Sequence, residues 1–231
     1  MRAARGDWKV ILTPNRPVPA AWFGDIRGQA LLCLASGGGQ QAPILAAAGA
    51  HVTSFDNSDE QLALDRLVAD RDGLSLRTIQ GDMANLAVFG DESFDLIFHP
   101  VANLFVPDIK PVWRECARVL KPGGRLLSGF MNPAFYYFDH DVAEKTGNWS
   151  VKYRLPFSPL TSLDARERQK LIESNSPLEF GHSLDDQIGG QLNAGLVIAG
   201  CYEDDWSDEA TPFNRFGPMY IATLARKPPL A

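Results

Sequence analysis

The part of the sequence best suited to chemistry is the run of three glycines at positions 37–39. The apolar stretch Leu31–Leu34 precedes the glycines, and Gln40 and an alanine-rich stretch follow them. This order is typical of a strand that enters a tight turn and opens a helix. Glycine has no side chain, so the backbone of such a turn can approach a bound cofactor closely. The pattern predicts a cofactor site, and two classes of cofactor fit it.

A dinucleotide is the first candidate. Residues 37–42 satisfy the pattern G-x-G-x-x-G/A, and Asp56 follows Gly39 at close to the ~20-residue spacing of a ribose-binding carboxylate. Both features have structural alternatives. Glycine turns also follow strands without binding anything, and an acid such as Asp56 is favoured by the dipole of the helix that it precedes.

A second acid, Asp82, follows the third predicted strand in the sequence QGDM. A nicotinamide-dependent enzyme does not require a carboxylate at this position. An enzyme that binds adenosine and an amino acid in one ligand does require an acceptor there. Asp82 is placed to accept a hydrogen bond from the adenine amino group, and Met83 can lie against the adenine face. Asn57 is a further candidate for the adenine or ribose. Both residues also have a structural alternative. Asp82 could be a turn acid, and Asn57 could pair locally with the backbone.

Two histidines are candidates for a proton acceptor, because histidine has the unperturbed side-chain pKa closest to neutral. His99 follows the predicted strand 93–98 on the crevice side of the sheet, and it is equally a candidate for cofactor contact or for capping the strand. His182 stands where the chain returns to the sheet. His51 opens a strand at the opposite edge, so we expect it to be structural, and His140 has no defined position.

Strands and helices alternate through the first 130 residues. Hydrophobic patterns predict strands at 31–35, 51–56, 74–79, 93–98 and 125–130. Helices are predicted at 40–48, at 58–72 with Leu64, Leu67 and Val68 on the apolar face, and at 108–120, where residues 121–124 (KPGG) end the helix. This alternation predicts parallel βαβ units and a doubly wound α/β sheet.

The rhythm changes after Phe130. Residues 132–182 are aromatic-rich and contain a charged segment, so we interpret them as an insertion that forms a substrate lid. Asn103, Tyr136 and Tyr137 are the predicted substrate contacts. A helix at 183–195 with Ser183 as N-cap and two strands at 196–206 and 219–228 complete one domain that spans residues 1–231.

Composition excludes several classes. The 231-residue chain carries a net charge of −6, which disfavours non-specific nucleic acid and anionic membrane surfaces as partners. No stretch approaches the ~20 apolar residues of a membrane span, and residues 10–12 are too short for a signal sequence. The three cysteines lack CxxC spacing, so we expect no zinc site. These features predict a soluble, cytoplasmic protein; its oligomeric state is not specified.

Four motifs together carry a family resemblance. In the sequences LCLASGGGQ, VTSFDNSDEQL, QGDMANLAVFGDESFDLIF and RVLKPGGRLL, which cover about residues 30–130, the chain resembles the class I S-adenosylmethionine (SAM)-dependent methyltransferases that act on small molecules. The resemblance implies a Rossmann-like seven-stranded sheet whose last strand is antiparallel. It implies SAM as the cofactor and methyl transfer to an oxygen, nitrogen or carbon nucleophile.

The resemblance also assigns residues to the cofactor. Gly37 and Gly39 would let the backbone approach the methionine moiety, Asp56 would bind the ribose hydroxyls, and Asp82 and Met83 match the adenine-contacting positions. The neighbouring cofactor contacts are expected at Ala35, Ser36, Gln40, Asn57, Gly81 and His99. Cys33 replaces the usual acid of the first strand, and Ala35 replaces the usual first glycine. A nicotinamide-dependent oxidoreductase and a SAM-binding protein without catalysis are the alternative hypotheses.

Overall fold

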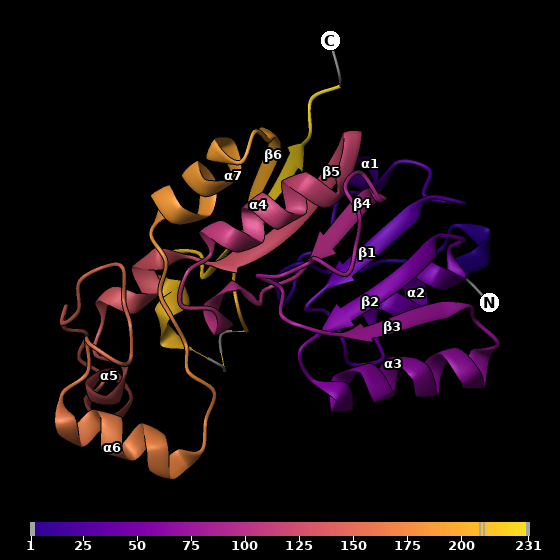
Figure 1. The fold of residues 1–231 in the computed structure, drawn as a ribbon. Coiled ribbons are helices and arrows are strands. Elements are labelled where there is room, and N and C mark those ends of the chain that lie inside the picture. The colour runs from indigo at the N-terminus through magenta and orange to yellow at the C-terminus, as the bar shows by residue number, and fades with distance from the viewer. Residues whose placement is uncertain (1–2, 208, 210, 230–231) are drawn as a thin grey trace.

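A computed structural model places helices on both faces of one seven-stranded sheet (Figure 1). The structure describes residues 3–207, 209 and 211–229. The strand order is β3-β2-β1-β4-β5-β7-β6. Strands β1 to β5 pair in parallel, whereas β7 pairs antiparallel with both β5 and β6. The predicted doubly wound sheet with an antiparallel last strand is confirmed.

The elements have these bounds. The strands are β1 Ala30–Leu34, β2 His51–Asp56, β3 Leu76–Gln80, β4 Phe94–His99, β5 Leu120–Met131, β6 Val197–Asp204 and β7 Tyr220–Arg226. The α-helices are α1 Ala20–Phe23, α2 Gln41–Ala47, α3 Asp59–Asp72, α4 Lys110–Val119, α5 His140–Thr146, α6 Ala165–Ser174 and α7 Gly190–Asn193. Short 3-10 helices lie at Ala3–Arg5, Asn103–Phe105, Pro133–Tyr137 and Pro212–Arg215, and a π-helix lies at Asp185–Gly189.

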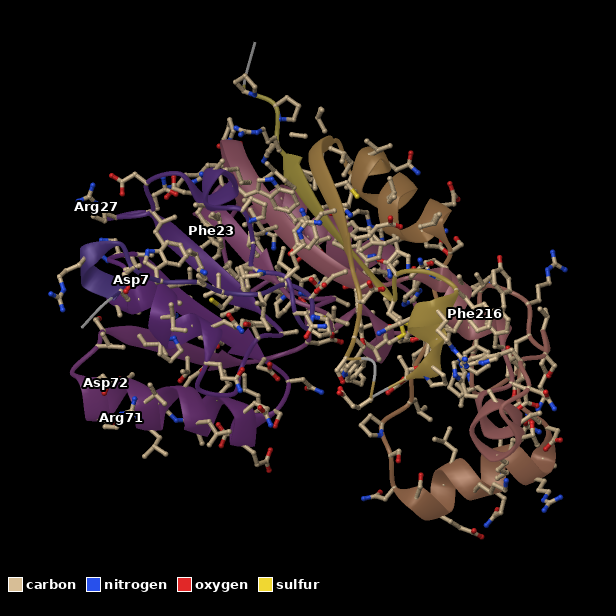
Figure 2. All side chains as sticks on the ribbon, turned by 180° about the vertical axis from the view of Figure 1, so that it is seen from behind. Asp7, Phe23, Arg27, Arg71, Asp72 and Phe216 are labelled. Atoms are coloured by element: carbon tan, nitrogen blue, oxygen red, sulfur yellow. The ribbon has the colours of Figure 1, made fainter. Side chains whose placement is uncertain are left out.

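Each face of the sheet has its own apolar core, because alternate side chains of a strand point to opposite faces. Leu31 and Cys33 of β1 pack with α1 and α2, and Leu32 and Leu34 pack with α4. In Figure 2, Phe23 of α1 lies in the interior, while Arg27, Arg71 and Asp72 lie at the surface. The fully buried Trp113 of α4 dominates the other core.

Three sequence predictions differ from the structure. The predicted apolar face of α3 is wrong: Leu64 and Leu67 are exposed, and the buried residues of this helix are Leu62, Asp65 and Ala69. Residues 121–124 end α4 as expected, but they belong to β5 and shift its register against β4. The helix predicted at 183–195 is a π-helix followed by the short α7.

The parallel strands end at one edge of the sheet, which we call the carboxyl edge, and the insertion lies off this edge (Figure 1). The insertion contains α5 and α6, and α6 buries none of its described residues. An aromatic cluster ties the insertion to the chain after β6: Trp149 packs against Phe213 and Phe216 at ring distances of 5.4 and 5.7 Å. Phe216 lies at the opposite end of the molecule from Arg71 in Figure 2.

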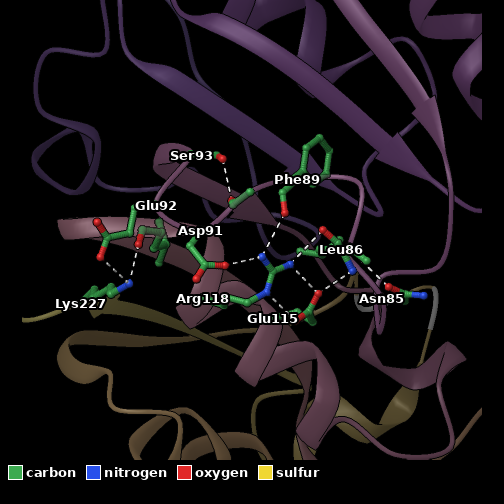
Figure 3. Close-up of polar contacts among 12 residues, drawn as sticks. Asn85, Leu86, Phe89, Asp91, Glu92, Ser93, Glu115, Arg118 and Lys227 are labelled. Atoms are coloured by element: carbon green, nitrogen blue, oxygen red, sulfur yellow. Dashed lines mark hydrogen bonds and ion pairs between the residues drawn. The ribbon is translucent and has the colours of Figure 1, made fainter.

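An arginine holds the segment between β3 and β4 in place (Figure 3). Arg118 of α4 donates two parallel hydrogen bonds of 2.8 Å to the carboxylate of Glu115, and it also donates to the carbonyl oxygens of Leu86 and Phe89 and to Asp91. Glu115 in turn accepts the backbone N–H of Leu86 at 2.7 Å. The opposite charges keep the pKa of Glu115 low and raise that of Arg118. This network fixes the chain that directly follows Asp82.

None of the helices in the described part of the chain has the length and apolar character that a bilayer crossing requires.

We expect Arg118→Ala to lower the free energy of unfolding by about 2–3 kcal/mol, because it removes charge-assisted hydrogen bonds to Glu115 and leaves the carbonyl oxygen of Phe89 without its donor. Urea unfolding measures the change. Arg114→Ala is the matched control: Arg114 is on the same helix, is exposed, and has no recorded hydrogen bond in the described structure. Equal stabilities of the two variants would contradict the assigned role of Arg118.

Candidate active site

The turn after β1 begins with an unusual backbone conformation. Ala35 has φ +48°, in the left-handed region that favours glycine, and its N–H donates to the carbonyl oxygen of Phe55 at 2.7 Å. The methyl group of Ala35 therefore stands where the resemblance predicted a glycine. The bond to β2 and the surrounding turn hold the residue in this conformation.

The next three glycine amides are bound by side chains and backbone of β2 and α3. Gly37 N donates to Asp56 Oδ2 at 3.0 Å, Gly38 N to the carbonyl oxygen of Gln61 at 3.0 Å, and Gly39 N to Asp65 Oδ1 at 2.7 Å. A Cβ on Gly37 would lie 2.8 Å from the Cβ of Gln61, so no larger residue fits there. The turn is thus fixed by two carboxylates before any ligand binds.

Asp65 is the less expected of the two carboxylates. Its side chain is fully buried, and its second oxygen accepts the hydroxyl of Ser54 at 2.6 Å. Burial raises the pKa of Asp65, although both hydrogen bonds favour the charged form. Asp65 was not among the predicted site residues, because the expected apolar face of this helix was formed by Leu64, Leu67 and Val68. The available signal was the period of α3, in which residues 62, 65 and 69 share one face.

The glycine turn, with its amides already bonded, distinguishes a dinucleotide from SAM as the cofactor. A dinucleotide places an anionic pyrophosphate against free N–H groups of such a turn. Here the amides of Gly37, Gly38 and Gly39 already have acceptors, and two of those acceptors are the carboxylates of Asp56 and Asp65. A pyrophosphate would find no free donor among these amides and would be repelled by both charges. A cationic or neutral ligand meets neither obstacle.

The residues predicted around the nucleoside lie at the carboxyl edge of β2 and β3. Asp56 is half-buried and uses its other oxygen, Oδ1, to accept from Ser58 N at 3.0 Å. Gly81 N donates to the carbonyl oxygen of Asp56 at 2.9 Å, which brings the two strand ends together. Asn57 is exposed, and its carbonyl oxygen accepts from Gln80. Asp56, Asn57 and Gly81 therefore share one rim.

Asp82 and Met83 extend this rim. Asp82 is exposed, and its Oδ1 accepts the backbone N–H of Ala84 at 2.8 Å, as expected for a turn acid. Its second oxygen has no hydrogen-bond partner among the described residues. Met83 is 8% exposed and packs in the core with Phe55 and Leu86. Met83 thus belongs mainly to the core, and only its small exposed part is available to a ligand.

A pocket of about 300 Å³ lies at the methionine end predicted by the resemblance. The turn residues Ala35–Gly37 and Gln40 form one wall of it, and residues 11–14 of the N-terminal segment form another. The hydroxyl of Ser36 is buried and has no hydrogen-bond partner. Gln40 is exposed at the start of α2 and makes no capping bond.

His99 is not placed to act as a base, which corrects the prediction. The ring is fully buried, with Nδ1 2.9 Å from the carbonyl oxygen of Leu34 and Nε2 2.5 Å from Oδ1 of Asn103. Burial lowers the pKa of His99 and favours the neutral ring. Both nitrogens have protein partners and the ring is fully buried, so His99 joins β1 to β4 and has no exposed nitrogen to offer a substrate.

His182 and Asn103 belong to the same buried network and need the same correction. His182 Nε2 lies 3.0 Å from the carbonyl oxygen of Asn103, and burial lowers the pKa of His182. The side chain of Asn103 is 1% exposed and is bonded to His99 and Gln187. Asn103 therefore holds the two histidines together and has no exposed amide to offer a substrate.

The network extends across the core through two glutamines that the sequence analysis missed. Gln191 donates to the carbonyl oxygen of Gln187 and accepts from Thr223 of β7. The π-helix that carries Gln187 also accepts the indole N–H of Trp113, through Asp186, at 2.9 Å. Buried polar networks that are fully bonded specify one arrangement of the elements they join. Sequence patterns give no sign of this pairing, because Asn103 and Gln187 are 84 positions apart.

The two predicted tyrosine contacts differ in exposure. Tyr137 is 40% exposed, whereas Tyr136 is 7% exposed, stacks on Phe157 at 5.6 Å, and has a buried hydroxyl without a partner. Burial raises the pKa of Tyr136, and the charge of Glu179 adds to the effect. In the described part of the chain no cluster of three or more histidine, cysteine or acidic side chains could hold a metal ion.

The sheet and the bonded glycine turn define an α/β protein with a candidate cofactor site at the carboxyl edge. Residues 32–128 match the methyltransferase domain family. A Bacillus subtilis (strain 168) protein described as the uncharacterized methyltransferase YbaJ is 53% identical over 203 residues, which cover 88% of this chain and 79% of that protein. The chain therefore belongs to the methyltransferase family, and it is a class I SAM-dependent methyltransferase.

Two further similarities differ in sequence identity and in the share of each protein that they cover. A Neurospora crassa sterol 24-C-methyltransferase is 36% identical over 184 residues, which cover 79% of this chain but only 42% of that enzyme. A crystal structure of a SAM-dependent methyltransferase from Mesorhizobium loti superposes with a TM-score of 0.67 at 19% identity, covering 89% of this chain and 94% of that one. At this identity the second similarity supports the fold.

Two substitutions at Asp65 separate its hydrogen bonds from its charge. Asp65→Ala should lower the free energy of unfolding by about 2–4 kcal/mol, because Gly39 N and the Ser54 hydroxyl lose their buried acceptor. Asp65→Asn keeps one acceptor and one donor without a buried charge. Its stability at pH 7 should therefore lie within about 1 kcal/mol of the wild-type value, or above it.

The pH dependence checks the cause. The pKa of Asp65 is higher in the folded state than in the unfolded state, so protonation favours folding. This contribution is fully present below the unfolded pKa and is lost as the pH rises through the folded pKa. The stability of Asp65→Asn relative to wild type should therefore fall as the pH is lowered from 7 toward 4 in urea unfolding series. A constant difference would contradict a desolvated carboxylate.

Proposed function

We propose that this methyltransferase binds SAM across the carboxyl ends of β1, β2 and β3 and transfers its methyl group to a small organic molecule held under the insertion. The observation that carries the cofactor placement is the glycine turn, whose amides are occupied by Asp56 and Asp65. This turn accepts a ligand with a sulfonium and an amino group better than one with a pyrophosphate.

Asp56 has two roles in this proposal. Its oxygens hold Gly37 and Ser58, and each carboxylate oxygen can accept a second hydrogen bond, so the ribose hydroxyls can donate to the half-buried face. Asn57 and Gly81 lie beside it on the same rim. Asp82, with one oxygen unpartnered, is the acceptor for the adenine amino group, and Met83 offers the exposed part of its thioether to the ring.

The amino-acid end of the cofactor lies in the pocket at Ala35, Ser36 and Gln40. Cys33 stands where the family usually has an acid, and it is fully buried with a raised pKa, so it supplies no negative charge. The unpartnered Ser36 hydroxyl and the exposed Gln40 side chain are the polar groups available here. We infer that this end is held by neutral hydrogen bonds.

The acceptor molecule enters from the side of the insertion, residues 132–182, which serves as the substrate lid. Support comes from its position off the carboxyl edge (Figure 1), from its exposed Tyr137, and from a relative named for sterol methylation. An oxygen, nitrogen or carbon nucleophile on a compact organic molecule fits this arrangement. The accepting atom is the part of the proposal that turnover assays must identify.

Catalysis in this site rests on positioning. SAM, when bound, supplies a methyl group already activated by its sulfonium centre. The chain fixes the turn and the strand ends before binding, so that the nucleophile can be held in line at contact distance. His99 and His182 are committed to Asn103 and Leu34 and take no proton from the substrate.

Calorimetry with S-adenosylhomocysteine tests the cofactor site. We expect micromolar binding, no binding of NADH, and at least tenfold weaker binding in Asp56→Ala, a change of about 1.4 kcal/mol. Asp59→Ala is the matched control, because Asp59 is an exposed acid three residues later that pairs only with Arg66 in the described structure. Unchanged affinity in Asp56→Ala would remove Asp56 from the site.

Substitution of the exposed lid tyrosine tests the acceptor side. Tyr137→Ala should leave the affinity for S-adenosylhomocysteine within about twofold while altering the rate of methyl transfer across a panel of phenols, amines and sterols. Tyr136→Phe is the companion variant, since it removes only the unpartnered hydroxyl. If Tyr137→Ala lost cofactor binding and kept its fold, the lid assignment would be wrong.

A further inference from the structure

The N-terminal segment forms a strap that crosses the carboxyl edge of the sheet. We define the N-terminal strap as residues 10–18. Its two ends pair, with Val18 N donating to the carbonyl oxygen of Val10 at 3.0 Å and an antiparallel bridge between Ile11 and Pro17. Val10, Leu12 and Val18 are buried in the core on the α1 and α2 face. The strap is therefore an ordered part of the fold.

The strap contacts elements that are far apart in the sequence. Ile11 N donates to Oε1 of Gln41, the first residue of α2, at 3.2 Å. The carbonyl oxygen of Leu12 accepts from Val101 N, after β4, at 3.2 Å. Leu12 also lies directly on β5, because a Cβ on Gly129 would come 2.3 Å from its carbonyl oxygen. Only glycine permits this approach.

Asp204, the last residue of β6, clamps the outer end of the strap. Its Oδ2 accepts the backbone N–H of both Asn15, at 2.9 Å, and Arg16, at 2.8 Å. The Asn15 side chain donates to the carbonyl oxygen of Asp205 at 2.6 Å, and the Arg16 guanidinium lies 4.5 Å from the centre of the Tyr202 ring. One carboxylate thus joins the far edge of the sheet to the N-terminal strap.

The clamped strap forms a wall of the pocket at the glycine turn. Residues 11–14 face Ala35–Gly37 across about 300 Å³. Thr13 lies on the strap side of this pocket and Ser36 on the turn side, and both hydroxyls are buried. The Thr13 hydroxyl interacts with the hydroxyl of Tyr202 on β6, which ties the strap to the same strand as Asp204.

We propose that the N-terminal strap closes the cofactor pocket and that Asp204 is a positioning residue that sets cofactor affinity by holding the strap in its closed position. The proposal rests on the proposed cofactor site. Asp204 touches no ligand; it acts through Asn15 and Arg16, which fix the place of Thr13. Closure by a clamped strap compensates for the missing acid at Cys33, because it encloses the amino-acid end of SAM from a second side.

The expected size of the effect follows from the population of the closed strap. Apparent affinity falls in proportion to the fraction of molecules in the binding-competent state. Loss of the two clamp bonds favours the open strap, and we expect the closed fraction to fall to about 10–20%. Asp204→Ala should therefore weaken binding of S-adenosylhomocysteine about five- to tenfold. Asp204→Asn keeps one acceptor oxygen and should show an intermediate loss.

The test compares full-length wild type, Asp204→Ala, Asp204→Asn and Asp205→Ala. Asp205 is adjacent and carries the same charge, but its side chain makes no recorded bond in the described structure, so Asp205→Ala should bind within twofold of wild type. Calorimetry measures the affinity for S-adenosylhomocysteine. Hydrogen exchange of the peptide that contains residues 10–18 should become faster in Asp204→Ala and slower in wild type when S-adenosylhomocysteine is added.

Each outcome separates this proposal from the cofactor site itself. A strap that exchanges faster in Asp204→Ala while affinity is unchanged would make the clamp merely structural and overturn the proposal. Unchanged exchange would show that Asp204 does not hold the strap, which also overturns it. Equal losses in Asp204→Ala and Asp205→Ala would assign the effect to charge alone. Wild type that fails to bind S-adenosylhomocysteine would instead refute the proposed cofactor site.

Discussion

The pinning of the glycine turn by Asp56 and Asp65 is the interaction on which the site depends. A glycine-rich backbone has large conformational entropy, so a turn of three glycines needs external bonds to keep one shape. Asp56 supplies its bond from the end of β2, and Asp65 supplies its bond from the buried face of α3. The bonds that these two carboxylates accept fix the backbone of the turn, and they also occupy amides that a phosphate would need as donors. The same two interactions therefore set the conformation of the turn and disfavour a phosphate ligand.

Burial of Asp65 has two opposed effects on the stability of the fold. The carboxylate is removed from water, which disfavours its charged form, and two hydrogen bonds offset part of that cost. An amide would satisfy the same partners without the charge. A negative charge beneath the turn, however, is favourable to a ligand with a cationic centre.

Positioning also explains the buried histidines. His99 and His182 meet at Asn103, and the network continues through Gln187 to the antiparallel edge of the sheet. Such a chain of hydrogen bonds fixes the end of β4 against β1, so the floor of the crevice has one geometry. A transfer from an activated methyl needs this geometry more than it needs a proton acceptor. His99 and His182 are therefore bonded members of this buried network.

The sequence by itself determined the parallel sheet, the glycine turn and the rim acids, because these follow from local patterns: alternating hydrophobicity, glycine runs and acids at strand ends. The predicted buried face of α3 was wrong. Asp65 is buried because Gly39 N and the Ser54 hydroxyl donate hydrogen bonds to it, and folding alone brings these two residues next to α3. The burial of His99 and the placement of the N-terminal strap likewise depend on tertiary contacts. Local pattern specifies which residues enter an element; which side chains a polar group will meet depends on chain segments brought together by folding.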